Sequence, residues 1–246
     1  MSEIKVISFD LDNTLWDVNH VILQAEKLQR DWLRVHAPVV LESFAPPDML
    51  NLRKELLTQQ PELQHNLSQL RESVLFLALR RSGYREPQAR RLAREGFDVF
   101  LHARHDVTYY DHALEVLEEL TGNYILGALS NGNAEIQRLG LDRFFSFSFS
   151  AASVGVGKPD PAMFQAALSL NDIHASEMIH IGDHPIDDIQ GAAQLGIHTL
   201  WINHSGEPYT GNITPSAAAE SLREVPPLVA AMAAAMAAAI DTTRSA

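Results

Sequence analysis

Three aspartates stand close together near the start of the chain. Asp10, Asp12 and Asp17 fall within eight residues, directly after the apolar run Ile4–Phe9. Like charges at such short spacing destabilise one another unless they are protonated or bridged by a cation. Carboxylate oxygens without histidine or cysteine ligands suit a hard divalent ion such as magnesium. The segment therefore predicts an acidic Mg²⁺ site at the end of a buried strand.

Other polar groups follow later apolar runs in the same way. They are Ser130-Asn131-Gly132, Lys158-Pro159, and Gly182-Asp183 with Asp187 and Asp188. In open parallel sheets, ligands bind beyond the carboxyl ends of the strands, so these groups are expected to meet. Lys158 supplies a positive charge and Ser130 a hydroxyl donor for an anion. A metal, a lysine and a hydroxyl together indicate a site for phosphoryl groups.

Five short apolar runs have the length and composition of strands. They are Lys5–Phe9, Tyr124–Leu129, Phe145–Phe149, Met178–Ile181 and His198–Ile202. Helical segments are expected between them at 111–120, 161–170 and 188–195, with Gly122 and Gly196 as left-handed C-caps. Strands that alternate with helices predict an α/β fold, a Rossmann-like doubly wound parallel sheet.

The alternation is interrupted between Trp16 and Tyr110, where the apolar residues keep a helical period in four segments. This pattern predicts a four-helix cap domain, 17–110, inserted into a discontinuous α/β core of 1–16 and 111–246. Near the C-terminus, the Ala-rich run Leu228–Ile240 predicts a helix. That helix either packs on its own domain or joins two copies, so the protein is expected to be a monomer or a homodimer.

Composition narrows the classes of partner. The chain carries 19 basic and 31 acidic residues, a formal charge of −12, which disfavours nucleic acid and anionic membranes. Its N-terminus lacks the pattern of a signal peptide, and Leu228–Ile240 is shorter than the roughly 20 residues of a bilayer span. We therefore expect a cytoplasmic protein that acts on a small solute.

The ordered motifs resemble those of the haloacid dehalogenase superfamily of hydrolases. Its first motif, Asp-x-Asp-x-Thr, matches Asp10, Asp12 and Thr14, and the second matches Ser130. The third matches Lys158, and the fourth matches Gly182-Asp183 with a following acid. The helical insert stands where that superfamily places its smaller type of cap. The resemblance covers residues 1 to about 205 and is closest to bacterial phosphatases that act on FMN and on the phosphorylated riboflavin precursor.

The resemblance implies a magnesium-dependent phosphatase for a small phosphorylated metabolite. Asp10 would be the nucleophile and Asp12 the general acid and base. Asp10, the backbone carbonyl of Asp12, Asp183 and Asp188 would support the metal. Residues implied to order the loops or hold the phosphate are Thr14, Ser130, Asn131 and Lys158.

Several alternatives stay open. A sugar phosphomutase would share all four motifs, and a 2-haloacid dehalogenase would use the same nucleophile on carbon without a metal. Asp12 argues against the dehalogenase, whose relatives usually carry an aromatic residue there. A non-catalytic binding protein on the same fold is a further alternative. Also open are the choice between Asp187 and Asp188, the roles of His20 and His184, and the substrate.

Overall fold

The computed structural model describes the backbone of residues 3–244 and the side chains of residues 3–238. The chain divides into two compact units. One contains the N-terminal segment through Asp17 and the chain from Thr108 onward, and the other is Val18–Val107. The predicted domain boundaries, after Trp16 and after Tyr110, lie close to these divisions. The function of the second unit as a cap stays a prediction.

The first unit is built on a parallel sheet whose six strands, in the described part of the chain, have the order β3-β2-β1-β4-β5-β6. The strands are β1 (Val6–Phe9), β2 (Ile125–Ser130), β3 (Phe147–Ser150), β4 (Met178–Gly182), β5 (His198–Ile202) and β6 (Ala217–Ala219). Every residue of β1 and β4 is buried, which explains their uninterrupted apolar character. β2 and β3 lie on one side of β1, whereas β4, β5 and β6 lie on the other side. The order of the strands therefore reverses between β1 and β4, and these two strands form the switch point of the sheet.

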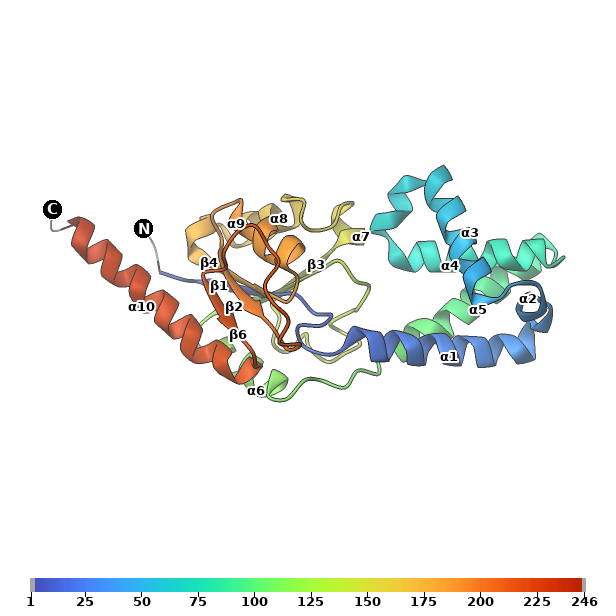
Figure 1. Cartoon of the computed structure of the whole chain (residues 1–246), viewed down its shortest axis with the longest axis horizontal. Coiled ribbons are helices and arrows are strands. Elements are labelled where there is room, and N and C mark those ends of the chain that lie inside the picture. The colour runs from blue at the N-terminus through green and yellow to red at the C-terminus, as the bar shows by residue number, and fades with distance from the viewer. Residues whose placement is uncertain (1–2, 245–246) are drawn as a thin grey trace. The chain divides into compact units, whose positions relative to one another are not determined.

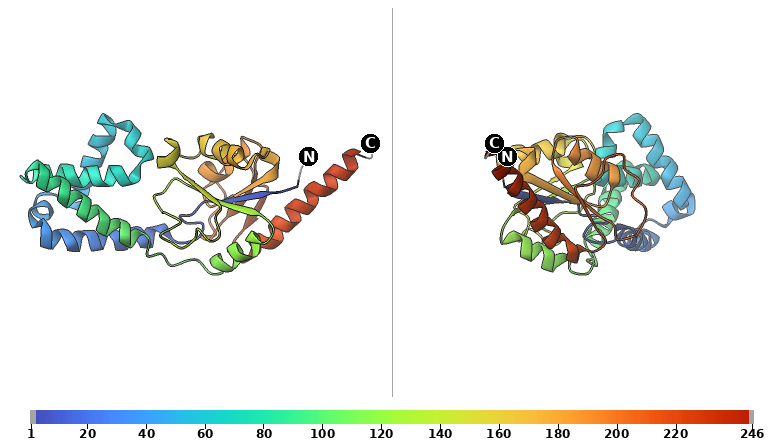
Figure 2. Two further views of the ribbon diagram at one scale, coloured as in Figure 1. Left: turned by 180° about the vertical axis from the view of Figure 1, so that it is seen from behind. Right: turned by 60° about the vertical axis from the view of Figure 1, so that its left-hand side comes forward.

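Helices cover both faces of this sheet (Figure 1). α6 (Ala113–Thr121) and α10 (Val225–Arg244) lie on one face. On the other are α7 (Ala151–Val154), α8 (Ala162–Asn171) and α9 (Gly191–Ala193), and the view from behind shows the same layers (Figure 2). The predicted fold, a doubly wound α/β sheet, is confirmed.

The Ala-rich C-terminal helix forms as predicted and begins by packing on its own unit. Val225 and Val229, in the first two turns of α10, are fully buried. The 3₁₀ turn η4 (Leu222–Glu224) leads into the helix and also packs against α6. No helix in the described part of the chain is long and apolar enough to cross a membrane.

Three local features differ from the sequence-based expectation. β6 was not predicted, because it is a three-residue edge strand of alanine, a residue that is depleted in strands. Gly122 does not supply a left-handed C-cap, since its φ of −66° is right-handed, whereas Gly196 does, with φ +82°. The helix expected at 188–195 begins earlier, as the π-helical turn η3 (Pro185–Gln190).

The second unit, Val18–Val107, is entirely helical, and every one of its residues is described. Its elements are α1 (Val18–His36), α2 (Pro38–Ser43), α3 (Pro46–Gln59), the 3₁₀ turn η1 (Pro61–His65), α4 (Leu67–Arg81) and α5 (Glu86–Arg104). Four helices were predicted, and the six-residue α2 is an addition. α5 packs against both α1 and α4. A Cβ at Gly96 would lie 2.9 Å from Leu75 and 3.1 Å from Trp32, so this glycine lets the three helices approach closely.

Candidate active site

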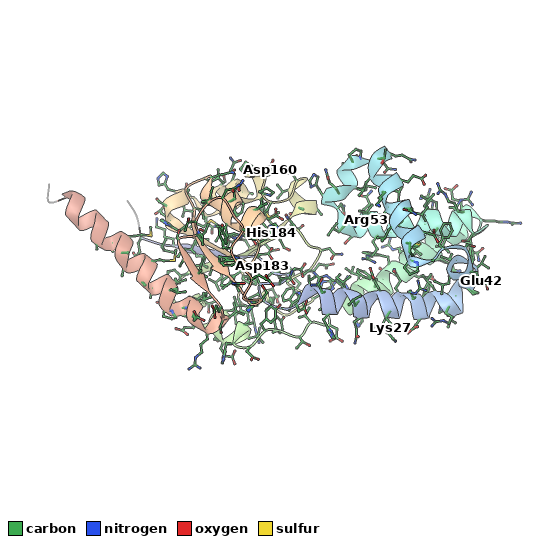
Figure 3. The ribbon with its side chains drawn as sticks, in the orientation of Figure 1. Lys27, Glu42, Arg53, Asp160, Asp183 and His184 are labelled. Atoms are coloured by element: carbon green, nitrogen blue, oxygen red, sulfur yellow. The ribbon has the colours of Figure 1, made fainter. Side chains whose placement is uncertain are left out.

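The aspartates meet at the switch point of the sheet. β1 and β4 are hydrogen-bonded neighbours, with Phe9 beside Ile181 in the register. Asp10 follows β1, and Asp183 follows β4 in the loop labelled in Figure 3. The two loops therefore leave adjacent strands at their carboxyl ends, where doubly wound folds bind ligands.

Asp10, Asp183 and Asp188 form a three-carboxylate cluster. One oxygen from each lies within 4.8 Å of the others. Burial raises the pKa of Asp10 well above its usual range, although the charge of Lys158 opposes this rise. Burial and the charge of Asp188 raise the pKa of Asp183 to about 6. An all-oxygen donor set in which burial disfavours the ionised forms of Asp10 and Asp183 fits a hard divalent ion such as Mg²⁺.

Lys158 is a buried cation that links two of these carboxylates. Its Nζ donates to Asp10 Oδ1 at 2.7 Å, to Asp188 Oδ1 at 2.6 Å and to the Leu129 carbonyl at 2.6 Å. These three bonds use the full donor capacity of an ammonium group. Burial acts to lower the pKa of Lys158, but the charges of Asp10 and Asp188 outweigh it and raise that pKa above 10.5. Lys158 is therefore a fixed positive charge.

The structure distinguishes Asp188 from Asp187. Asp188 is buried, and Lys158 and a hydrogen bond from His180 overcome the effect of burial and lower its pKa below the usual range. Asp187 is only partly buried and accepts from Asn131 Nδ2 at 3.2 Å. Neither aspartate caps the following helix, because His184 is the N-cap of η3 and its Nδ1 accepts from the Asp187 amide at 3.0 Å. Asp188 is thus the acid that joins the cluster.

Asp12 stands beside the end of β2. Its Oδ1 accepts a hydrogen bond from Trp16 Nε1 at 2.9 Å. A Cβ at Gly132 would lie 2.3 Å from Asp12 Oδ2 and 3.2 Å from Ser130 Oγ. Only glycine at this position therefore leaves room for the side chains of Asp12 and Ser130 beside the backbone. Ser130 is buried, and its hydroxyl accepts from the Gly132 amide at 3.0 Å. The Asp12 side chain is not part of the three-carboxylate cluster.

Thr14 and Asn131 connect loops from different strands. The fully buried Thr14 donates its hydroxyl to Asp183 Oδ1 at 3.2 Å, which joins the loops after β1 and β4. Asn131 Nδ2 donates to the Lys158 carbonyl at 2.9 Å, and its Oδ1 accepts from the Lys158 amide at 2.7 Å. All of the predicted site residues in the core therefore gather at one edge of the sheet.

Comparison with known proteins agrees with this arrangement. A family model described as haloacid dehalogenase-like hydrolase matches residues 4–196, which is most of the chain. The chain belongs to the haloacid dehalogenase-like hydrolase family. This confirms the resemblance inferred from the four ordered motifs.

Relatives of this hydrolase have different named activities. It is 28% identical over 202 residues to 5-amino-6-(5-phospho-D-ribitylamino)uracil phosphatase YigB of Escherichia coli, covering 82% of this chain and 84% of the relative. It is 32% identical over 161 residues to phosphoserine phosphatase of Thermus thermophilus, covering 63% of each protein. The crystal structure of 2-haloacid dehalogenase from Pseudomonas syringae is 41% identical in sequence, with a TM-score of 0.89, and the match covers 92% of this chain and 98% of that one.

Some contacts of this hydrolase's site were not predicted from the sequence. Trp201 Nε1 donates to the Asp183 carbonyl at 2.7 Å, and His204 Nε2 lies 3.1 Å from the Thr14 carbonyl. His180 lies inside β4, where it is completely buried and makes two hydrogen bonds. One of its partners is Asp188, however, so it also contacts the site. No local spacing marks these residues, because each contact joins a strand or loop to a different element and depends on how the elements pack.

Proposed function

We propose that this hydrolase cleaves the phosphate monoester of a small metabolite through an ester formed on Asp10. The observation that carries the proposal is the placement of Asp10 among Lys158, Asp183 and Asp188 at the switch point. A divalent ion held by Asp10, Asp183 and the carbonyl of Asp12, with Asp188 in support, would offset the negative charge of the phosphoryl group and the carboxylates.

The chain's own residues supply the nucleophile and the proton transfers. The Asp10 carboxylate attacks phosphorus, the bond to the leaving oxygen breaks, and Asp12 gives that oxygen a proton. Asp12 then takes a proton from the water that attacks the phosphorus of the aspartyl phosphate, and the bond to Asp10 breaks. The sum of the two steps is phosphate ester and water giving alcohol and inorganic phosphate. Ser130 and the amides near Asn131 would hold the phosphoryl group, and the positive charge of Lys158 would attract it from its place beside Asp10.

The substrate that we propose to test first follows from the relatives. The Escherichia coli relative is named as a phosphatase of a phosphorylated ribitylaminouracil, and FMN carries the same phosphorylated ribityl chain. A panel of phosphate esters that includes both compounds, compared by kcat/KM, would rank them against sugar phosphates, nucleotides and phosphoserine. The cytoplasmic location and the monomeric or homodimeric state stay predictions.

Removal of metal is expected to abolish turnover. With p-nitrophenyl phosphate as the probe, EDTA-treated protein should be inactive and added Mg²⁺ should restore activity, because the carboxylate cluster repels an anionic substrate until a cation is bound. Release of p-nitrophenol measures the reaction. Full activity in EDTA would contradict the role given to the cluster.

The similarity to the Pseudomonas syringae protein supports a second candidate function, that of a 2-haloacid dehalogenase. Asp10 would then attack carbon and halide would leave. Water would hydrolyse the resulting ester to a hydroxy acid, the free Asp10 carboxylate and a proton. No step needs a metal, so chloride release from 2-chloropropionate in EDTA distinguishes the two candidates. We favour the phosphatase because an alkoxide leaving group needs a proton donor, whereas a halide does not. Asp12, which lies beside Trp16 and Ser130, provides that donor.

Displacing Asp12 is expected to impair the phosphatase. In Gly132→Ala the new methyl group would occupy the space of Asp12 Oδ2, and misplacing a catalytic group by about 1 Å costs on the order of 100-fold in rate. Steady-state kinetics with p-nitrophenyl phosphate would measure this loss. Gly122→Ala is the matched control, because its backbone is right-handed and the nearest neighbour of the added Cβ is 3.5 Å away. Equal rates for the two variants would exclude the proposed role of Asp12 as the general acid and base.

A further inference from the structure

Ser8 and His180 form a buried polar pair beneath the carboxylate cluster. They are register neighbours on β1 and β4, and both are fully buried. Ser8 Oγ lies 2.7 Å from His180 Nδ1. The imidazole ring also packs edge-on against Phe164 of α8, with the ring centroids 5.0 Å apart. The pair therefore has a defined position in the centre of the sheet.

This pair is unusual in the central strands, where the adjoining residues are apolar. Burying a serine and a histidine is less favourable than burying two apolar side chains unless their hydrogen bonds are well satisfied. The outer nitrogen of the ring, Nε2, lies 3.1 Å from Asp188 Oδ1. The polar pair is thus the inner end of a continuous hydrogen-bonded chain that reaches the candidate site.

The hydrogen positions in this chain follow from the atoms that face one another. Asp188 Oδ1 accepts from the Lys158 ammonium group, and His180 Nε2 faces that same oxygen, so Nε2 carries the hydrogen and donates to Oδ1. Nδ1 of the neutral ring then accepts from the Ser8 hydroxyl. Without that donor the imidazole could adopt the other tautomer, in which a lone pair on Nε2 would face the carboxylate.

The Asp188 carboxylate is held from three directions. Its Oδ1 accepts from His180 and from Lys158 Nζ, and its Oδ2 accepts from the His184 amide at 2.9 Å. A Cβ at Gly182 would lie only 2.3 Å from Asp188 Cγ, so the carboxyl group rests against the backbone of β4. Loss of the bond from His180 would free the carboxylate to rotate and change its contact with Lys158.

We propose that Ser8 and His180 are positioning residues: Ser8 fixes the tautomer of His180, and His180 holds Asp188 where Lys158 reaches both Asp188 and Asp10. Their catalytic importance rests on the proposed phosphatase function. Neither residue touches the substrate or the reacting atoms. They act through Asp188, as the hydrogen-bond partners of metal-site carboxylates do in other proteins.

The test compares variants that remove or keep the donor to Asp188. His180→Leu removes it, His180→Gln keeps an N–H group near the position of Nε2, and Ser8→Ala removes the support of the tautomer. Thr199→Val is the matched control, because Thr199 is buried beside His180 in the register and hydrogen-bonds Ser216 instead of Asp188. Turnover of p-nitrophenyl phosphate with Mg²⁺ is measured for each, and urea denaturation monitors stability.

We expect His180→Leu to lower kcat by about 10- to 100-fold, which is the usual cost of removing such a partner. His180→Gln should recover most of this loss, Ser8→Ala should lose less than His180→Leu, and Thr199→Val should retain the wild-type kcat. A role in folding alone predicts losses of stability without rescue of kcat by glutamine. Wild-type kcat in folded His180→Leu, or equal losses in folded His180→Leu and His180→Gln, would overturn the proposal.

Crystal structures of the wild type and of His180→Gln and His180→Leu separate this inference from the proposed function. The bond between Lys158 Nζ and Asp188 Oδ1 should persist in the glutamine variant and break or lengthen in the leucine variant. An unchanged bond in His180→Leu would overturn the positioning role, whatever the activity. If His180→Leu does not fold, Ser8→Ala takes its place in this comparison. A wild-type protein that does not hydrolyse any phosphate ester would instead overturn the proposed function.

Discussion

Replacing Asp10 with asparagine should lower the turnover of p-nitrophenyl phosphate by on the order of 10⁴-fold or more, the scale of loss seen when a nucleophile is removed. A carboxamide of the same shape cannot form the phosphate ester. The buried surroundings should tolerate the change, because Lys158 keeps its bonds to Asp188 and to the Leu129 carbonyl. Steady-state kinetics measure the loss, and mass spectrometry after acid quenching should detect a phosphorylated Asp10 only in the wild type.

The control for this variant is an aspartate outside the site. Asp142 is exposed in the loop before β3, so Asp142→Asn should keep the wild-type rate. Thermal unfolding of both variants would show whether the fold persists. Equal turnover by Asp10→Asn and the wild type would exclude the covalent route. Since a dehalogenase would also need Asp10, this experiment tests the nucleophile, and the metal dependence tests the class of reaction.

The sequence predicted which loops come together more accurately than it predicted the helices and turns around them. Asp10 and Asp183 are far apart in the chain, yet both follow apolar runs that could only be central strands of a parallel sheet. Topology then requires their loops to meet at the carboxyl edge. The meeting of these loops depends only on the order of the strands and the polar residue after each one, and it does not depend on exact element boundaries.

Features set by short-range geometry were harder to predict. The turn η3 starts at Pro185, where proline fits the first helical position and the His184 side chain caps the amide of Asp187. The expected start at Asp188 would have left that residue at a helix end. Its actual place inside a π-helical turn directs the carboxylate toward Lys158, a local irregularity that is common at functional sites.

Side-chain partners from distant segments could not be predicted at all. The contact of His180 with Asp188 depends on a strand neighbour, Ser8, and on the close approach allowed by Gly182. A histidine inside an apolar run carries no local sign of such a partner. Hydrogen bonds of this kind are determined by the packing of several elements together and can be identified only after the fold is known.

Replacing Lys158 with methionine should reduce both activity and stability by large amounts. Methionine fills a similar volume but leaves Asp10 and Asp188 without their shared cation in a buried position. Removing one partner from a buried ion pair costs about 3–5 kcal/mol, so the free energy of unfolding of metal-free protein should fall by about that amount. Urea denaturation with EDTA present measures this change, and turnover of p-nitrophenyl phosphate with Mg²⁺ should fall together with it.

The matched control for Lys158→Met is Lys54→Met, at an exposed position of α3. An exposed lysine contributes little to stability, and its replacement should change the free energy of unfolding by less than about 0.5 kcal/mol. If the two variants are equally stable, the buried carboxylates do not depend on Lys158 for their charge compensation. A stable but inactive Lys158→Met would instead mean that the lysine serves the phosphoryl group alone, and that Asp188 is held in place by His180 and the His184 amide without it.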